Sequence, residues 1–190
     1  MSRSANAFAA LTVILSLHLP SPVASGSIPR DTLSSLDRNR PTHISLSLQD
    51  QKLLWAINQK EASGRPFVRP RYEPAFYHRY IAWNIRFREA ERRYGSRAVS
   101  SSYGPWQIMY STAVELGYEG PPDHLNHASV SLPYVLRYLN QLRATFDGDM
   151  AKVISSYNAG PGGMGSNPAY THEVLALLEK APSSWQVFGT

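Results

Sequence analysis

The side chains of this sequence that could do chemistry are mainly carboxylates and histidines, because the chain of 190 residues contains no cysteine. The absence of cysteine excludes thiol nucleophiles, disulfides and thiolate metal ligands. No Gly-x-Ser-x-Gly elbow is present, and no glycine-rich loop ends in Lys-Ser or Lys-Thr. These absences argue against the serine-hydrolase elbow and against a nucleotide-binding P-loop.

The histidine-containing segment offers little support for a metal site. Asp123, His124 and His127 lie in a proline-containing stretch, and no fourth ligand follows at a regular spacing. A metal site needs a complete ligand set. We therefore expect surface histidines here, and neither a metal nor another cofactor in the protein.

Glu61 is the carboxylate in the most unusual sequence position. It ends an apolar, helix-forming stretch just before Ser63-Gly64, whereas Glu89 and Glu91 stand among arginines as on a solvated face. The dipole at a helix C-terminus disfavours negative charge, and partial burial does the same. Both effects raise the pKa of a carboxyl group, as a general acid working near neutral pH requires. On this evidence alone, an exposed glutamate at a helix end is the favoured interpretation.

The elements that must position Glu61 are predicted to be helices. Ser47 and Asp50 resemble an N-terminal cap, and Ser63-Gly64 is a stop signal, so the first helix should cover residues 48–62. Further helical patterns are expected at residues 76–94, 105–117, 132–142, 150–157 and 168–180. Residues 100–103 are predicted to be a polar loop, and no segment alternates as a strand should. The predicted fold class is mainly α.

The N-terminus has the composition of an export signal. Arg3 precedes an apolar stretch at residues 8–19, and prolines and small residues follow. This order predicts a signal peptide at residues 1–25, against the alternative of a buried N-terminal helix, and an exported protein without a stable membrane anchor. Residues 26–45 are predicted to be a flexible leader, residues 46–182 one folded domain and residues 183–190 a tail.

The charge balance suits an anionic partner and a merely solvated basic surface equally well. Lysine and arginine outnumber aspartate and glutamate by 19 to 14, a net charge of +5. Nucleic acid, an anionic membrane surface and an anionic polysaccharide would all fit this excess. Because no run of consecutive basic residues occurs, a nucleic-acid-binding tail is not expected.

Separated motifs resemble those of the soluble lytic transglycosylase family. They are Lys60-Glu61-Ala62-Ser63-Gly64, Ser102-Tyr103-Gly104-Pro105-Trp106-Gln107-Ile108-Met109, Ser111-Thr112-Ala113 and Tyr157-Asn158-Ala159-Gly160. Their order and spacing match, and the resemblance spans roughly residues 48–178. Two departures are Ala62, which separates Glu61 from Ser-Gly, and Pro105-Trp106, where the family has Leu-Met.

The resemblance implies a lysozyme-like helical domain of the goose type, with a substrate groove. It implies cleavage of the β-1,4 bond from N-acetylmuramic acid to N-acetylglucosamine in peptidoglycan, with Glu61 acting first as acid and then as base and leaving a 1,6-anhydro end. The same resemblance places a set of residues at the substrate: Ser102, Gln107, Met109, Tyr157, Asn158 and Tyr170. Ser102 could instead bond to the Glu61 carboxylate, Met109 could equally belong to the core, and Tyr170 is more often a packing residue.

Two alternatives stay open. Glu73 could be a second carboxylate that activates water, which would give a hydrolytic, lysozyme-like product, or it could form a salt bridge with Arg69 or Arg71. A non-catalytic peptidoglycan-binding module would keep the groove without the reaction. In each case the expected partner is the peptidoglycan glycan strand, the expected location periplasmic or extracellular, and the expected state a monomer.

Overall fold

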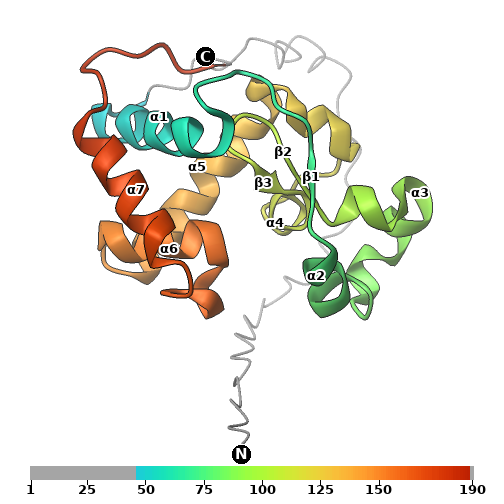
Figure 1. Ribbon diagram of the computed structural model, residues 1–190. Coiled ribbons are helices and arrows are strands. Elements are labelled where there is room, and N and C mark those ends of the chain that lie inside the picture. The colour runs from blue at the N-terminus through green and yellow to red at the C-terminus, as the bar shows by residue number, and fades with distance from the viewer. Residues whose placement is uncertain (1–45, 189–190) are drawn as a thin grey trace, which may run out of the picture. The chain divides into compact units, whose positions relative to one another are not determined.

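The computed structural model describes residues 46–188 (Figure 1). The predicted signal peptide and flexible leader lie outside the described residues. The first helix, α1 (Leu48–Ala62), begins where the Ser47 side chain accepts a hydrogen bond of 3.0 Å from the Asp50 backbone N–H. It ends at Ser63, whose positive φ of 52° stops the helix. Both predicted ends of this helix are confirmed.

The C-terminal half is built from three longer helices at the predicted places. They are α5 (Ala128–Thr145), α6 (Met150–Ala159) and α7 (Pro168–Glu179). Asp149 caps α6 and Asn167 caps α7, because each side chain accepts a backbone N–H of the first turn. A short 3₁₀ turn, Pro161–Gly163, follows α6.

The segment from residue 71 to residue 117 differs from the prediction. A small antiparallel sheet joins β1 (Arg71–Tyr72), β2 (Ser101–Tyr103) and β3 (Ile108–Met109), in that order. The predicted polar loop at residues 100–103 is therefore wrong, as is the expectation that no strand forms. Strands of two or three residues are too short for an alternating pattern to identify them.

The helix predicted from Pro105 begins five residues later, as α4 (Tyr110–Glu115). Gly104 and Gln107 have φ values of 74° and 50°, so the chain turns between β2 and β3 instead of entering a helix. A 3₁₀ turn, Pro122–Asn126, leads from α4 to α5.

The helix predicted at residues 76–94 is also wrong as a single element. It is divided into α2 (Pro74–Phe76), a π-helical turn (Tyr77–Ile81), a 3₁₀ turn (Ile85–Phe87) and α3 (Arg88–Val99). Asn84 causes one break, because its extended backbone leaves the helix and its side chain accepts the Arg86 N–H at 3.1 Å.

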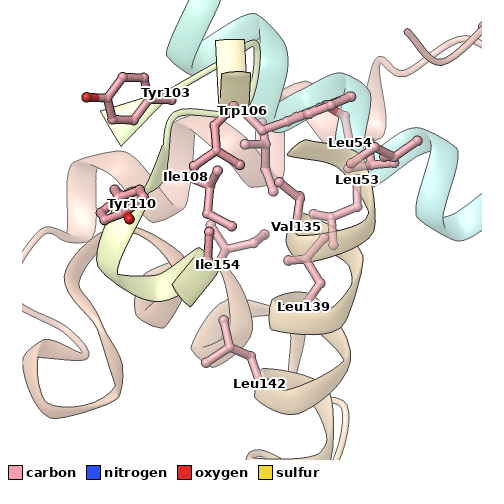
Figure 2. Packing of buried hydrophobic residues seen from close by; sticks show 14 of the residues in the cluster. Leu53, Leu54, Tyr103, Trp106, Ile108, Tyr110, Val135, Leu139, Leu142 and Ile154 are labelled. Atoms are coloured by element: carbon pink, nitrogen blue, oxygen red, sulfur yellow. The ribbon is translucent and has the colours of Figure 1, made fainter. Parts of the chain in front are cut away.

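The core joins α1, α5 and α6 to the segment that follows β2 (Figure 2). Trp106 is completely buried, and its indole N–H donates to the Leu54 carbonyl at 3.0 Å. Leu53, Leu54 and Val135 are also fully buried in this cluster, and such burial contributes about 1.5–3 kcal/mol for each large aliphatic side chain. The core therefore fixes α1 against the turn between β2 and β3. The domain is mainly α, as predicted.

Residues after α7 have no regular structure as far as Phe188, but Val187 is buried in the core. The domain boundary at residue 182 stays a prediction. Within the described part of the chain, no helix is both long and apolar enough to cross a membrane.

Candidate active site

Glu61 lies in the last turn of α1, where α1 packs against α7 (Figure 1). Only 7% of its side chain is exposed. Tyr170, in the first turn of α7, donates a hydrogen bond of 2.8 Å to Glu61 Oε1. Glu61 is therefore a buried carboxyl group held by a neighbouring helix, and not the exposed helix-end glutamate of the alternative interpretation.

Burial raises the pKa of Glu61 above its ordinary value. The Tyr170 hydrogen bond and the charges of Arg71 and Lys60 act in the opposite direction and lower this pKa, but burial has the larger effect. Glu61 therefore keeps its proton to a higher pH than an exposed glutamate would. A general acid that acts near neutral pH needs this property.

Arg71 lies between two carboxylates. Its terminal nitrogen Nη1 is 3.4 Å from Glu61 Oε2, and its Nε is 2.7 Å from Glu73 Oε1. Residues two apart along an extended chain point to the same side, so the chain that continues from β1 into Glu73 brings the side chains of Arg71 and Glu73 together. The predicted salt bridge of Glu73 is confirmed, with Arg71 and not Arg69 as the partner.

A second ion pair joins α1 to α7 next to Glu61. Lys60 pairs with Glu173, and the Lys60 ammonium lies 5.9 Å from the centre of the Tyr170 ring. Lys60 thus contacts the residue that bonds to Glu61. This pair joins α7 to the end of α1 on the partly exposed side of the contact.

Tyr157 and Asn158 lie at the end of α6. Tyr157 donates a hydrogen bond of 2.8 Å to the Trp106 carbonyl. Its pKa is raised, first by burial and then by the negative charge of Glu61, which places it in the electrostatic surroundings of Glu61. Asn158 instead accepts a hydrogen bond of 3.1 Å from Asn167, across the glycine-rich loop between α6 and α7.

Ser102 and Gln107 hold the turn between β2 and β3. Ser102 donates to Gln107 Oε1 at 2.8 Å, and the Gln107 amide N–H donates to the Gly104 carbonyl at 3.0 Å. Both side chains are buried.

The sheet register relates these residues to Arg71. Arg71 stands opposite Ser102 on β2, and Ser102 stands opposite Met109 on β3. Residues directly opposite each other in an antiparallel sheet point to the same face. Ser102 and half-buried Met109 therefore share the sheet face of Arg71, the residue that reaches Glu61. The structure brings Tyr170 into contact with Glu61, Tyr157 near it, and Ser102 and Met109 onto the sheet face beside it.

Comparison with protein families identifies the family of this chain. The family described as Transglycosylase SLT domain matches residues 47–175, which include all of α1, the sheet, α6 and most of α7. The chain belongs to this family. Proteins with an SLT domain are lytic transglycosylases that act on peptidoglycan outside the cytoplasm. Comparison with curated proteins and with solved structures gave no significant match.

The contacts of two residues near Glu61 in this SLT domain were not predicted from the sequence. Arg71 reaches Glu61 only through the pairing of β1 with β2, which gave no periodic signal. Asn58 is fully buried one turn before Glu61, and its amide N–H groups donate to the carbonyls of Pro105 at 3.0 Å and of Arg65 at 2.9 Å. A polar residue inside the apolar pattern of α1 was the available signal for Asn58.

Within residues 46–188 of the SLT domain, no group of three or more histidine, aspartate or glutamate side chains is placed to bind a metal ion. His124 and His127 are exposed at the 3₁₀ turn before α5.

Proposed function

We propose that this protein is a peptidoglycan lytic transglycosylase that cleaves the β-1,4 bond from N-acetylmuramic acid to N-acetylglucosamine. Glu61 acts first as acid and then as base, and the product carries a 1,6-anhydromuramoyl end. The observation that carries the proposal is the environment of Glu61: a buried carboxyl group with a raised pKa, beside Tyr170 and Arg71, in a domain of the SLT family.

In the first step, neutral Glu61 donates its proton to the glycosidic oxygen while the bond from that oxygen to the anomeric carbon breaks. Such donation typically contributes about 10²- to 10⁴-fold in rate. The transition state has oxocarbenium character. The carboxylate that remains accepts the Tyr170 hydrogen bond and faces the Arg71 guanidinium, so its negative charge is stabilised.

In the second step, the Glu61 carboxylate accepts the proton of the muramoyl 6-hydroxyl. That oxygen attacks its own anomeric carbon and closes the 1,6-anhydro ring. Glu61 is neutral again, and no water is consumed. An intramolecular nucleophile is already positioned, so one carboxyl group suffices.

The state of Glu73 favours this outcome over hydrolysis. A hydrolytic muramidase would need a second carboxylate to activate water. Glu73 accepts a charge-assisted hydrogen bond of 2.7 Å from Arg71, and a carboxylate so engaged is less available to accept a proton from water. We therefore assign Glu73 to orienting Arg71.

The other residues are proposed to bind the glycan or to shape the groove that holds it. Tyr157 and Met109 contact the glycan beside Glu61, and Asn158 contacts it or holds the loop after α6. Ser102 and Gln107 shape the groove through the turn that they hold, and Tyr170 positions the Glu61 carboxyl group. We further propose that the chain is exported by a signal peptide at residues 1–25 and acts as a monomer without a cofactor.

Mass spectrometry of purified peptidoglycan after complete digestion tests the proposal. We expect muropeptides that end in 1,6-anhydromuramic acid, each lighter by one water than the hydrolytic product. Products that end only in reducing muramic acid would establish a hydrolytic muramidase instead. Binding without any released muropeptide would establish a non-catalytic peptidoglycan-binding module.

A further inference from the structure

Arg71 faces the ionised form of Glu61 in the proposed reaction, and its two ion pairs allow this role to be specified further. Within the described residues it is the only basic side chain paired with two carboxylates, Glu61 and Glu73. About half of its side chain is exposed, whereas Glu61 is almost completely buried. Arg71 therefore reaches the buried Glu61 from the solvent side.

The two contacts of Arg71 are unequal. The Nε contact with Glu73 is 2.7 Å, a length typical of a strong charge-assisted hydrogen bond, whereas the Nη1 contact with Glu61 is 3.4 Å. The backbone fixes this arrangement, since Arg71 pairs with Ser102 and the Glu73 N–H donates to the Ser100 carbonyl at 3.1 Å. Glu73 thus holds the Arg71 guanidinium beside Glu61, while the distance from that guanidinium to Glu61 stays longer than a strong hydrogen bond.

We propose that Arg71 is a positioning residue, oriented by Glu73, whose guanidinium closes on Glu61 Oε2 whenever Glu61 has given its proton to the glycosidic oxygen. The inference rests on the proposed function, since it concerns the ionised state of Glu61 between the two steps. When Glu61 regains the proton, the attraction weakens and Glu73 keeps the guanidinium in place.

The arrangement gives Arg71 and Glu73 opposite effects on Glu61. The groups facing Glu61 are Lys60 on its own helix, Tyr170 of α7, Tyr157 of α6 and Arg71 of β1. Removal of the Arg71 charge makes ionised Glu61 less stable and raises its pKa. Removal of the Glu73 charge leaves Arg71 free to pair with Glu61 alone and lowers the pKa of Glu61. Two residues that only supported the fold would not have opposite effects.

The pH dependence of kcat/KM on soluble glycan strands tests this inference. Glu61 must be protonated to act as acid, so the rate falls as pH rises through its pKa. We expect the falling limb to move up by about 0.5–1 pH unit in Arg71→Gln and down by a similar amount in Glu73→Gln, as for a partly screened charge. The double variant should lie between them. Arg69→Gln is the matched control, because Arg69 is exposed and has no ion pair with a described residue.

Shifts in the same direction, no shift in either variant, or complete inactivity of Glu73→Gln would each overturn the inference. Product masses from the same samples separate it from the proposed function. Anhydro products together with unchanged pH profiles of the two variants would contradict only the role of Arg71. Products that end in reducing muramic acid, released by the unmodified protein, would contradict the proposed reaction itself.

A second feature, independent of the site, is the basic aromatic segment at residues 79–93. Among residues 46–188, six large hydrophobic side chains are exposed, and three of them lie here within six residues: Tyr80, Trp83 and Ile85, with exposed fractions of 52%, 85% and 73%. The segment also carries five arginines against two glutamates. Its arginines are Arg79, Arg86, Arg88, Arg92 and Arg93, all exposed.

None of these five arginines forms an ion pair with a residue in the range 46–188. Glu91 accepts a hydrogen bond from Tyr77, so one of the two acidic groups is already engaged. Arg79 and Arg93 lie over the rings of Tyr80 and Tyr94, and the charge of Arg86 acts to lower the pKa of Glu115. Arginines without an ion pair, beside exposed tryptophan and isoleucine, match the composition of segments that bind at the boundary between lipid headgroups and acyl chains. Arginine would meet anionic headgroups, and the apolar side chains would enter the boundary.

We also infer that the basic aromatic segment binds reversibly to an anionic phospholipid surface. Ile85 favours lipid over glycan as the occupant, since an exposed aliphatic side chain gains by leaving water for acyl chains and has no aromatic face for a sugar to stack on. Such a contact would hold the enzyme at a membrane beside its substrate.

Vesicles of phosphatidylglycerol and phosphatidylcholine, compared with phosphatidylcholine alone, test this second inference. We expect binding of the purified chain to the anionic vesicles to weaken at least tenfold in Trp83→Ser/Ile85→Ser and to remain in Leu48→Ser, a control with an exposed apolar residue outside the segment. Brominated lipid should quench fluorescence of the unmodified chain more than that of Trp83→Phe. Equal vesicle binding by Trp83→Ser/Ile85→Ser and by Leu48→Ser would overturn the inference. So would a Trp83→Ser/Ile85→Ser variant that binds purified peptidoglycan less well but binds vesicles as the unmodified chain does.

Discussion

The Tyr170 hydroxyl donates a hydrogen bond of 2.8 Å to Glu61 Oε1, although the two residues are 109 positions apart in the chain. The bond joins the first turn of α7 to the last turn of α1, and the pair of Lys60 with Glu173 joins the same helices next to it. Tyr170 stabilises the ionised form of Glu61, in opposition to burial. The packing of α7 on α1 therefore influences how strongly Glu61 holds its proton.

Tyr170→Phe should reduce kcat about tenfold and move the falling limb of the pH–rate profile to higher pH. The substitution keeps the ring but removes the hydrogen bond that lowers the pKa of Glu61, so Glu61 stays protonated longer and becomes a less stable carboxylate after the first step. The measurement is kcat and kcat/KM against pH. Tyr134→Phe is the control, since no hydrogen bond of the Tyr134 hydroxyl occurs among the described residues. An unchanged profile would mean that Tyr170 only packs.

Glu61→Gln should stabilise the fold at neutral and alkaline pH. The pKa of Glu61 is raised in the folded state, so its contribution to stability is full at low pH and is lost as pH rises through the folded pKa. Glutamine keeps the size and cannot ionise. We expect a melting temperature about 2–4 °C higher for each 1 kcal/mol gained at pH 8.

The same pair of proteins should melt at closely similar temperatures at pH 4, where Glu61 is mostly neutral. Glu89→Gln, on the exposed face of α3, should show no such pH-dependent difference. A lower melting temperature for Glu61→Gln at pH 8 would contradict the raised pKa.

Ser102→Ala should destabilise the domain by about 1–3 kcal/mol, because it leaves the buried Gln107 Oε1 without the donor at 2.8 Å. Urea unfolding measures the change. Ser156→Ala is the matched control, since the buried Ser156 hydroxyl has no hydrogen-bond partner among the described residues and its removal should cost little. Equal effects of the two substitutions would show that the Ser102 bond does not hold the turn.

The fold was predictable from the sequence where the apolar pattern is long and its ends are capped. Ser47 and Ser63-Gly64 fixed the ends of α1, and the spacing from Leu132 to Leu142 identified α5. The small sheet was not predictable, because its strands are stabilised by pairing between distant residues such as Arg71 and Ser102 and are too short to alternate. The single helix predicted at residues 76–94 failed because Asn84 favours an extended backbone and a side-chain cap.

Of the candidate site, only the residues with local sequence signals were predictable. Glu61 could be singled out because both its helix and its stop signal are local, whereas its burial depends on α7, more than one hundred residues away. Arg71 could not be assigned, since nothing local decides whether an arginine between Arg69 and Glu73 turns toward α1. The roles predicted for Tyr157, Asn158 and Met109 at the substrate stay predictions.

The proposed reaction requires Glu61 for both proton transfers. Its most direct test is the initial rate of anhydromuropeptide release from purified peptidoglycan by the unmodified chain and by Glu61→Gln, with Glu89→Gln as the control. We predict that Glu61→Gln loses about 10²- to 10⁴-fold or more in rate while it still folds and binds peptidoglycan, and that Glu89→Gln keeps full activity. Release of anhydromuropeptides by Glu61→Gln at the rate of the unmodified chain would contradict this role of Glu61.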